Sequence, residues 1–351
     1  MGGFRSSQNA GRSKAFGGAA PTRRREPRAK TAADSASRSG RVPLREDFLL
    51  ARIRSRVGRV RAPILVGPGH DAALVGWPRG RDLVLKTDQV VGGVHFVPGR
   101  DRLDLVGHKA VSRALSDVAA FGGEPVAALV AAALPPRFRL AEFDALLRGL
   151  LRACRESGTA LVGGDLSRID GPLVVSVSIA ARAPARGPKL RDGARPGDRI
   201  LVTGRLGGSL LGRHLRLRPR LSAGRALVRV AGVHAMMDVS DGLLKDLSRL
   251  ARSSGLAAVV EPERVPVHPD ARRLARSTGR PPREHALSDG EDHELLLAVA
   301  PAAAVRLARR GLPGGLRLTD IGRFRRGRGL FLRESGLERP VADLGHEHRF
   351  D

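Results

Sequence analysis

The chain has few residues of the kinds that build disulfide frameworks, base-stacking surfaces and membrane spans. Of its 351 residues only Cys154 is a cysteine, which excludes a disulfide framework and a multi-cysteine zinc site. Tyrosine is absent and aromatic residues make up 3%, which leaves little for stacking on bases. The longest apolar run, Val126–Leu134, is too short to span a bilayer. We therefore expect a cytoplasmic protein without a membrane partner.

Acidic residues are scarce relative to basic ones, and the formal net charge is +27. Only six of the 62 basic residues are lysine. A GC-rich coding bias produces such an arginine excess as readily as selection for phosphate binding does. We therefore expect a solvated arginine surface rather than a nucleic-acid groove. A non-catalytic protein that binds nucleic acid through that surface is kept as an alternative.

The chain divides into three parts by composition. Residues 1–45 are rich in Ser, Gly, Ala and Arg, lack the apolar segment of a secretory signal and are predicted to be a disordered basic tail. Helical and strand patterns alternate from Glu46 onward, interrupted by a Pro/Gly-rich joint at 184–198. The predicted fold class is α/β (α+β), with mixed sheets flanked by helices in two domains, 46–183 and 184–351.

The acidic residues that remain gather where predicted strands end and helices begin, often beside glycine. They lie in the segments "GPGHDAAL", "KTDQVVGG", "ALSDVAAFGG", "LVGGD", "DVSDG" and "SDGEDHEL". Taken singly, each acid has an ordinary structural role, such as an N-cap or a turn residue. Together they supply the oxygen ligands and close backbone approach that Mg²⁺ requires, with phosphate oxygens as further ligands.

The common signatures of phosphate-handling enzymes are absent. The sequence contains no GxxxxGK[ST] loop, no HRD/DFG pair and no GxGxxG after a strand. An enzyme of this sequence that uses ATP would therefore hold it through metal-binding acids rather than through a P-loop.

Seven motifs occur in an order that resembles the thiamine-monophosphate kinases, which belong to the aminoimidazole ribonucleotide synthetase-like ATP-binding superfamily. The motifs are "GPGHDAAL", "KTDQVVGGVHF", "GHKAVSRALSDVAAFGGEP", "LVGGD", "LRDGARPGD", "MMDVSDGLLKDL" and "ALSDGEDHEL". The resemblance implies a homodimer whose N-terminal sheets pack together. It also implies direct transfer of the γ-phosphoryl of ATP to thiamine monophosphate with several Mg²⁺ ions, so no catalytic side chain is assigned.

The resemblance also implies roles for individual residues. The implied metal ligands are Asp71, Thr87, Asp88, Asp117, Asp165, Asp238 and Asp241. The implied nucleotide contacts are Gly164, Asp165, Arg191 and Ser240. The implied contacts to thiamine monophosphate are His95, Glu291 and His346.

The sequence departs from the family pattern at five positions, which are His70, Lys86, Arg113, His293 and His346. Lys86 stands where a small hydroxyl residue is common, so it can pair with a phosphate or displace a metal ion. Because several of these changes put a basic group near the acids, a related enzyme of the same fold that acts on another phosphorylated acceptor is kept as a second alternative.

Overall fold

The computed structural model describes residues 46–59, 61–66, 74–77 and 79–346. The predicted tail, the metal-ligand candidate Asp71 and its neighbour His70 lie outside these residues. The helix expected from Glu46 is α1 (Glu46–Val57), and a short ribbon follows it, formed by β1 (Ile64–Val66) and β2 (Leu74–Val75). Among the described residues, no helix combines the length and the apolar character needed to cross a membrane.

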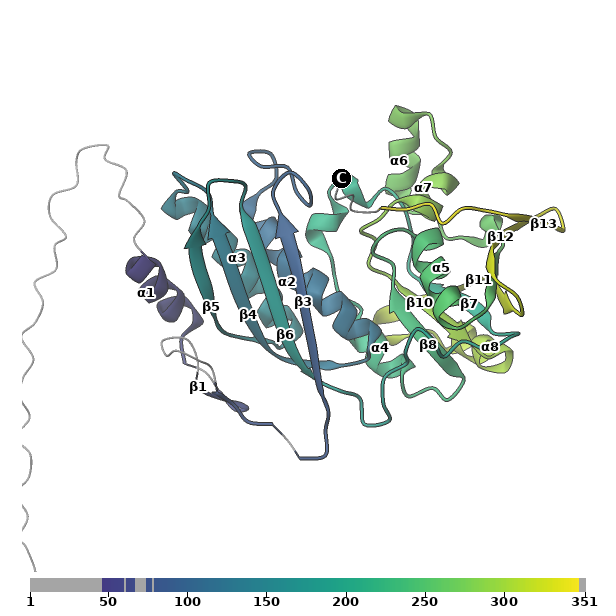
Figure 1. The fold of residues 1–351 in the computed structure, drawn as a ribbon, viewed down its shortest axis with the longest axis horizontal. Helices are drawn as coiled ribbons and strands as arrows, with labels where there is room; N and C mark the ends of the chain where they lie inside the picture. The colour runs from purple at the N-terminus through teal and green to yellow at the C-terminus, as the bar shows by residue number, and fades with distance from the viewer. Residues whose placement is uncertain (1–45, 60, 67–73, 78, 347–351) are drawn as a thin grey trace, which may run out of the picture. The chain divides into compact units, whose positions relative to one another are not determined.

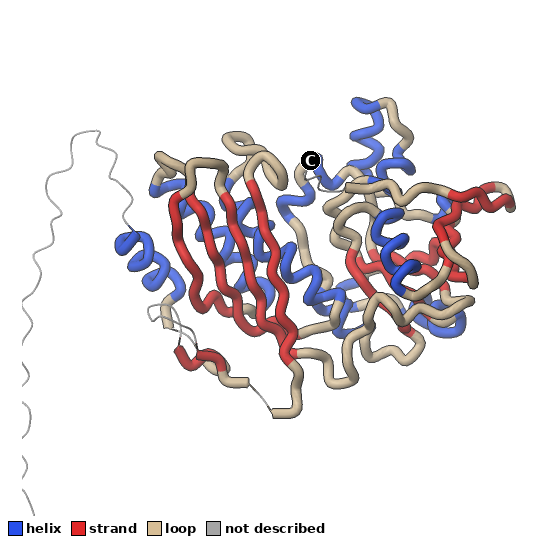
Figure 2. The backbone as a smooth tube through the Cα atoms, in the orientation of Figure 1, coloured by secondary structure: helices blue, strands red, loops and turns tan. Residues whose placement is uncertain are grey.

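The N-terminal half of the described chain is built on a four-stranded sheet with strand order β3-β6-β4-β5 (Figures 1 and 2). The pair β4–β5 is parallel, and the other two pairs are antiparallel. Helices α2 (Leu103–Ala120) and α3 (Leu140–Ser157) cover one face of this sheet, behind the strands in Figure 1. The strands are β3 (Leu83–Val91), β4 (Glu124–Leu134), β5 (Ala160–Arg168) and β6 (Val174–Arg182).

Two glycines allow α2 and α3 to pack closely. A Cβ atom on Gly107 of α2 would lie 2.2 Å from the carbonyl oxygen of Leu146, and one on Gly149 of α3 would lie 2.0 Å from that of Asp104. Both distances are far shorter than van der Waals contact, so a larger residue at either position would push the helices apart. This close contact fixes α2, which carries several of the candidate site residues.

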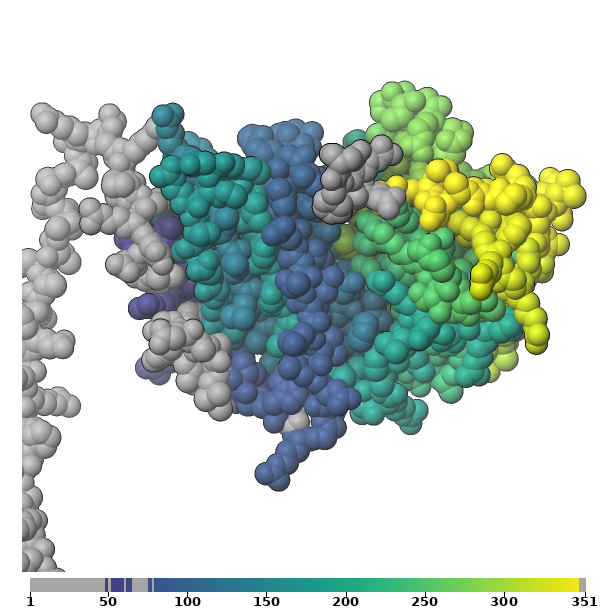
Figure 3. Space-filling model, viewed as in Figure 1, coloured from purple at the N-terminus to yellow at the C-terminus, as the bar shows by residue number. Residues whose placement is uncertain are grey.

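The alternation of side chains along β3 decides which of its residues face α2. Val84 and Val90 pack against the apolar core between the sheet and the helices. Because side chains two residues apart share a face, Lys86 and Asp88 lie on that side as well. The opposite face is covered in part by Ile64 and Trp77, which pack with Ala127 and Ala180. The rest of that face is open: Leu85 is 73% exposed, and Figure 3 shows β3 (blue) and β6 (teal) at the surface there.

The C-terminal half is built on a seven-stranded sheet with strand order β13-β12-β9-β11-β7-β10-β8. Only the pair β9–β12 is parallel in this sheet. The strands are β7 (Arg199–Thr203), β8 (Val233–Asp238), β9 (Ala257–Val260), β10 (Leu295–Val299), β11 (Leu318–Arg325), β12 (Gly329–Glu334) and β13 (Leu337–Pro340). The helices are α4 (Leu221–Leu227), α5 (Leu243–Ser253), α6 (Pro269–Thr278), α7 (Pro282–Ser288) and α8 (Pro301–Arg310).

Helix α5 shows why these elements form. Its apolar residues Leu243, Leu247 and Leu250 recur at helical spacing, and all three are buried in the core beside the sheet. Residues 183–198, between β6 and β7, form neither helix nor strand. Mixed sheets flanked by helices confirm the predicted fold class.

Candidate active site

A lysine ammonium lies among carboxylates where β3 faces α2. Lys86 Nζ is 2.7 Å from Asp117 Oδ2 and 3.8 Å from Asp88 Oδ2. Asp238, at the end of β8, is close enough for its charge to act on both Lys86 and Asp117. We call these four residues, Lys86, Asp88, Asp117 and Asp238, the Lys86 cluster.

The charges of the Lys86 cluster depend on one another. Burial and the negative charge of Asp238 raise the pKa of Asp117, although Lys86 opposes this. Burial alone would lower the pKa of Lys86, but the charges of Asp117, Asp88 and Asp238 outweigh it and raise that pKa. Lys86 is therefore positively charged at neutral pH and offsets the repulsion between the carboxylates.

Helix α2 presents a row of charged side chains at intervals of four residues, which places them on one face. Lys109 Nζ is fully buried and lies 3.1 Å from Glu291 Oε2. Arg113 lies 3.4 Å from Glu291 Oε1 and 3.5 Å from Asp88 Oδ1. Asp117 completes the row. Arg113 thus connects the Lys86 cluster to Glu291.

His293 joins Asp238 to Glu291 from the segment before β10. Its Nδ1 lies 3.2 Å from Asp238 Oδ2 and its Nε2 lies 3.3 Å from Glu291 Oε2. Burial opposes protonation, but these two carboxylates outweigh it and raise the pKa of His293 to about 9. Glu291 (φ 65°) and His293 (φ 51°) both adopt left-handed backbone conformations, which are uncommon for such residues and often mark functional sites.

Glu291 is surrounded by positive groups of the chain itself. Burial alone would raise the pKa of Glu291, but the hydrogen bond to His293 and the charges of Lys109 and Arg113 lower it. Both of its carboxylate oxygens are therefore already engaged. A substrate that contacts Glu291 would share these partners or displace one of them.

The turn between β8 and α5 holds Ser240 and Asp241. The backbone N–H groups of both residues donate to Asp246 Oδ2 at 2.9 Å, and the Asp241 carboxylate pairs with Arg249 at 2.5 Å. The N–H of His346, which is exposed, donates to the Asp241 carbonyl at 2.8 Å. These contacts fix the turn and bring the C-terminal segment against it.

Two further predicted site residues lie on β3 and in the segment that follows it. His95 Nδ1 accepts a hydrogen bond from the Val91 N–H at 3.0 Å, so a neutral His95 carries its proton on Nε2. The His95 carbonyl accepts from Lys109 Nζ at 2.6 Å, which ties this loop to α2. Thr87 points to the opposite face of the sheet from Asp88, where its hydroxyl accepts from Ser178 Oγ at 3.2 Å.

Gly164 and Asp165 lie on the far edge of the N-terminal sheet. The strand registers pair Asp88 with Val177, Val177 with Val130, and Val130 with Gly164. Three strand spacings, about 14 Å, therefore separate Asp88 from Gly164. Asp165, on the open face, cannot share an ion with Asp88 within one chain.

A cavity of about 290 Å³ adjoins the Lys86 cluster. Lys86, Asp117 and Arg191 line it together with apolar side chains that include Met236 and Met237. The Arg191 carbonyl accepts a hydrogen bond from Ser254 Oγ at 2.9 Å, which holds the loop that carries Arg191. A phosphorylated ligand in this cavity would meet two cationic side chains beside the acidic cluster.

Within the described part of the chain, no group of three or more Asp, Glu, His or Cys side chains is arranged to hold a metal ion. Asp88, Asp117 and Asp238 nevertheless offer carboxylate oxygens, the donors that Mg²⁺ prefers. Lys86 Nζ balances their charge in this arrangement. The donor chemistry thus fits Mg²⁺, although the Lys86 ammonium would compete with the ion for these carboxylates.

Two polar residues of this region were missed in the sequence analysis. Lys109 was detectable, because it precedes Arg113 and Asp117 at intervals of four residues in a predicted helix. Ser116 donates its hydroxyl to Asp238 Oδ2 at 2.7 Å. No sequence signal marks Ser116, since its partner lies 122 residues away.

The chain belongs to the family of AIR synthase related proteins: residues 69–183 match the N-terminal domain of that family and residues 198–333 match its C-terminal domain. Within this family it is similar to the thiamine-monophosphate kinases. It is 42% identical to the thiamine-monophosphate kinase of Rhodopirellula baltica over 74% of this chain and 83% of the relative. This confirms the resemblance found in the sequence.

Solved structures show the same relationship. The crystal structure of thiamine-monophosphate kinase from Stenotrophomonas maltophilia matches with a TM-score of 0.69 at 34% identity, over 82% of this chain and 96% of that one. The structure of AaThiL complexed with AMPPCP and TMP matches with a TM-score of 0.67 at 30% identity, over 86% of this chain and 96% of that one.

Proposed function

We propose that the protein transfers the γ-phosphoryl group of ATP to thiamine monophosphate, giving thiamine diphosphate and ADP. A phosphate oxygen of thiamine monophosphate forms a bond to the γ-phosphorus, and the bond from that phosphorus to the β–γ bridging oxygen breaks. The observation that carries this proposal is the Lys86 cluster beside a cavity lined by Arg191. The relatives named thiamine-monophosphate kinase, and the neighbour solved with AMPPCP and TMP, support the same substrates.

The reaction places few chemical demands on the side chains. The acceptor phosphate is already ionised at neutral pH, so no strong general base is needed, and catalysis depends on positioning and charge neutralisation. Lys86 and Arg191 line the cavity and offset the repulsion between the two phosphorylated substrates. Arg191 can bind a phosphate through two parallel hydrogen bonds.

The remaining assignments follow the family motifs. Asp88, Asp117 and Asp238 would hold Mg²⁺, with Asp71, Thr87, Asp165 and Asp241 as the further predicted ligands. Bound Mg²⁺ would supply positive charge to the phosphate oxygens. Gly164, Asp165, Arg191 and Ser240 would contact ATP, and His95, Glu291 and His346 would contact thiamine monophosphate.

In a homodimer, the predicted metal ligands Asp88 and Asp165 could come from different chains and still bind the same ion. Asp88 and Asp165 are too far apart in one chain, and the open face of the N-terminal sheet exposes Leu83, Leu85 and Leu129. If two such faces pack together, Asp165 of one chain can approach the Lys86 cluster of the other. The proposed unit is therefore a cytoplasmic homodimer in which each chain has two domains, 46–183 and 184–351.

One observation favours a second candidate, an enzyme of the same fold with another phosphorylated acceptor. Lys109, Arg113 and His293 already engage both oxygens of Glu291, and this leaves less room for a contact to a thiamine ring.

Product analysis separates the two candidates. The purified protein is incubated with ATP, Mg²⁺ and thiamine monophosphate, and the thiamine phosphates and adenine nucleotides are then separated. Thiamine diphosphate that appears one-for-one with ADP supports the proposal. ATP binding without thiamine diphosphate overturns it and points to another acceptor.

A further inference from the structure

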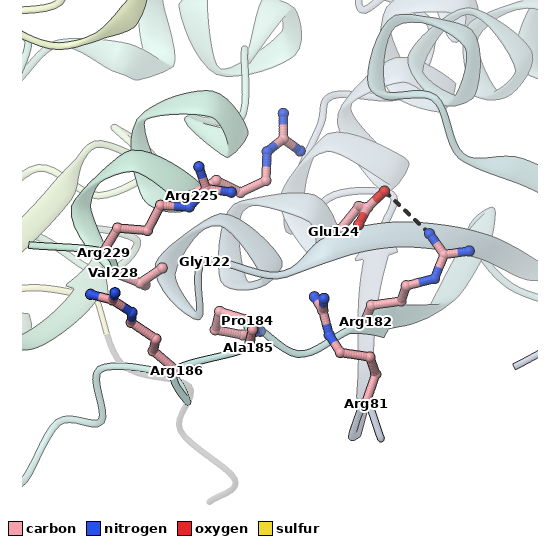
Figure 4. Close-up of a pocket in the computed structure, with 10 residues that line it drawn as sticks. All are labelled: Arg81, Gly122, Glu124, Arg182, Pro184, Ala185, Arg186, Arg225, Val228 and Arg229. Carbon is pink, nitrogen blue, oxygen red and sulfur yellow. Dashed lines mark hydrogen bonds and ion pairs between the residues drawn. The ribbon is translucent and has the colours of Figure 1, made fainter. Parts of the chain in front are cut away.

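A second cavity, of about 360 Å³, shares no lining residue with the cavity at Lys86. Figure 4 shows arginine side chains arranged around Gly122, Pro184 and Ala185. Glu124 is the one acidic residue among those that line it. The arginines are Arg81, Arg182, Arg186, Arg225 and Arg229.

Two of the arginines are held in place by the chain. Arg81 donates from Nε and Nη2 to the Ala183 carbonyl at 3.1 and 2.7 Å. Arg182 Nη1 donates to Glu124 Oε1 at 3.2 Å, the dashed contact in Figure 4. Arg182 Nε is buried and has no hydrogen-bond partner among the described residues. This N–H is a donor without an acceptor.

The side chains of the other three arginines have no polar partner within the described ranges. No hydrogen bond or ion pair joins the guanidinium groups of Arg186, Arg225 or Arg229 to another residue that the structure describes. The five arginines and Glu124 together give the lining of this cavity a net charge of +4. A concave wall of one charge focuses the electric field and concentrates counter-ions.

The floor of the cavity is closely packed. Gly122 adopts a left-handed conformation (φ 68°), and a Cβ atom there would lie 2.2 Å from Val228 Cγ1. Gly122 and Val228 both line the cavity. A side chain at position 122 would therefore displace Val228, next to Arg229, so the fold holds this wall in a defined position.

We propose that this cavity binds a small molecule through a diphosphate group. Guanidinium groups form paired hydrogen bonds with phosphate oxygens and stay charged at any physiological pH. A diphosphate offers several charged oxygens and suits the net charge of +4 better than a single carboxylate does. The volume lies within the range of small-molecule sites, about 300–1,000 Å³. The inference does not rest on the proposed reaction.

The bound diphosphate would link segments that are distant in the sequence. Arg81 precedes β3 and Arg182 ends β6, whereas Arg225 lies in α4 and Arg229 follows it. These like charges repel one another, and a bound diphosphate would replace that repulsion with attraction. Its binding therefore raises the melting temperature of the whole chain.

Isothermal titration calorimetry of the full chain with inorganic pyrophosphate, in EDTA, tests the proposal. The site variant is Arg225→Gln/Arg229→Gln. The matched control is Arg306→Gln/Arg309→Gln on the exposed side of α8, which removes the same charge. We expect one site per chain, an affinity at least tenfold weaker in the site variant, and a change of less than twofold in the control. Melting curves without ligand verify that both variants fold.

The proposal is overturned if the wild-type chain does not bind pyrophosphate, or if both variants lose affinity equally, since the general arginine surface would then be the cause. ADP and thiamine diphosphate are titrated in parallel. The compound whose affinity depends most on Arg225 and Arg229 is the source of the diphosphate group. Turnover is measured separately, so failure of the proposed reaction does not affect this result.

Discussion

Lys86 Nζ lies 2.7 Å from Asp117 Oδ2, so a side chain of β3 supplies a positive charge to a carboxylate of α2. The same ammonium lies 3.8 Å from Asp88 and within the electrostatic reach of Asp238. Lys86 and a divalent cation would compete for the same oxygens. Stability and metal binding are therefore expected to be linked in this protein.

Replacement of Lys86 by methionine removes this charge and keeps much of the side-chain volume. We expect the free energy of unfolding in EDTA to fall by roughly 1–3 kcal/mol. That is less than the ~3–5 kcal/mol typical of a fully buried pair, because the Lys86 side chain is 31% exposed. We also expect Mg²⁺ to raise the melting temperature more in Lys86→Met than in the wild type. Thermal denaturation with and without Mg²⁺ measures both effects.

The control for this experiment is Arg310→Met, which removes a positive charge at an exposed position on α8. Equal Mg²⁺-induced shifts in the wild type and in Lys86→Met would show that the ammonium does not compete with metal ions at these carboxylates.

The separation of Asp88 from Asp165 predicts complementation between variants. Asp88→Asn and Asp165→Asn are each expected to be inactive alone. After subunit exchange, half of the dimers are mixed and each mixed dimer contains one intact site, so about a quarter of wild-type activity should return. Size-exclusion chromatography verifies that dimers form. A mixture that stays inactive although mixed dimers are present would place both carboxylates in the site of one chain.

The lowered pKa of His214 leads us to expect that the folded chain loses stability in acid. Burial and the neighbouring Lys109 ammonium, 2.7 Å from His214 Nδ1, lower the pKa of His214 to about 4. Unfolded histidine has a pKa of about 6.5, so between these values the unfolded chain binds a proton that the folded chain does not. The stability contributed by neutral His214 is present above pH 6.5 and is lost as the pH falls toward 4.

In the variant His214→Gln, the glutamine side chain can still accept a hydrogen bond from Lys109, but it does not bind a proton in this pH range. Its free energy of unfolding should depend less on pH between 6.5 and 4 than that of the wild type. Urea denaturation at several pH values tests this, with His346→Gln at an exposed position as the control. Parallel curves for the wild type and His214→Gln would contradict the assignment.

Local patterns in the sequence predicted mixed sheets flanked by helices, although not every element, and motif order predicted the family. The pairing of Lys86 with Asp117 could be anticipated only as an excess of basic groups near acids, because β3 and α2 meet through packing that the sequence does not encode locally. The contact between Ser116 and Asp238 joins segments 122 residues apart. His293, which adopts a left-handed conformation, contacts Asp238 from 55 residues away, so neither feature could be predicted from local sequence. The opposite faces taken by Thr87 and Asp88 follow from strand alternation, which the motif comparison overlooked.

The role of the Lys86 cluster in phosphoryl transfer is tested most directly by the turnover of Asp88→Asn and Asp117→Asn with ATP, Mg²⁺ and thiamine monophosphate. Each variant removes one carboxylate of the Lys86 cluster and leaves a side chain of nearly the same shape. If these carboxylates organise the phosphoryl transfer, kcat/KM falls by about a thousandfold or more, about 4 kcal/mol of transition-state stabilisation, while circular dichroism shows a folded chain. Wild-type turnover in either variant would show that these carboxylates do not organise the transfer.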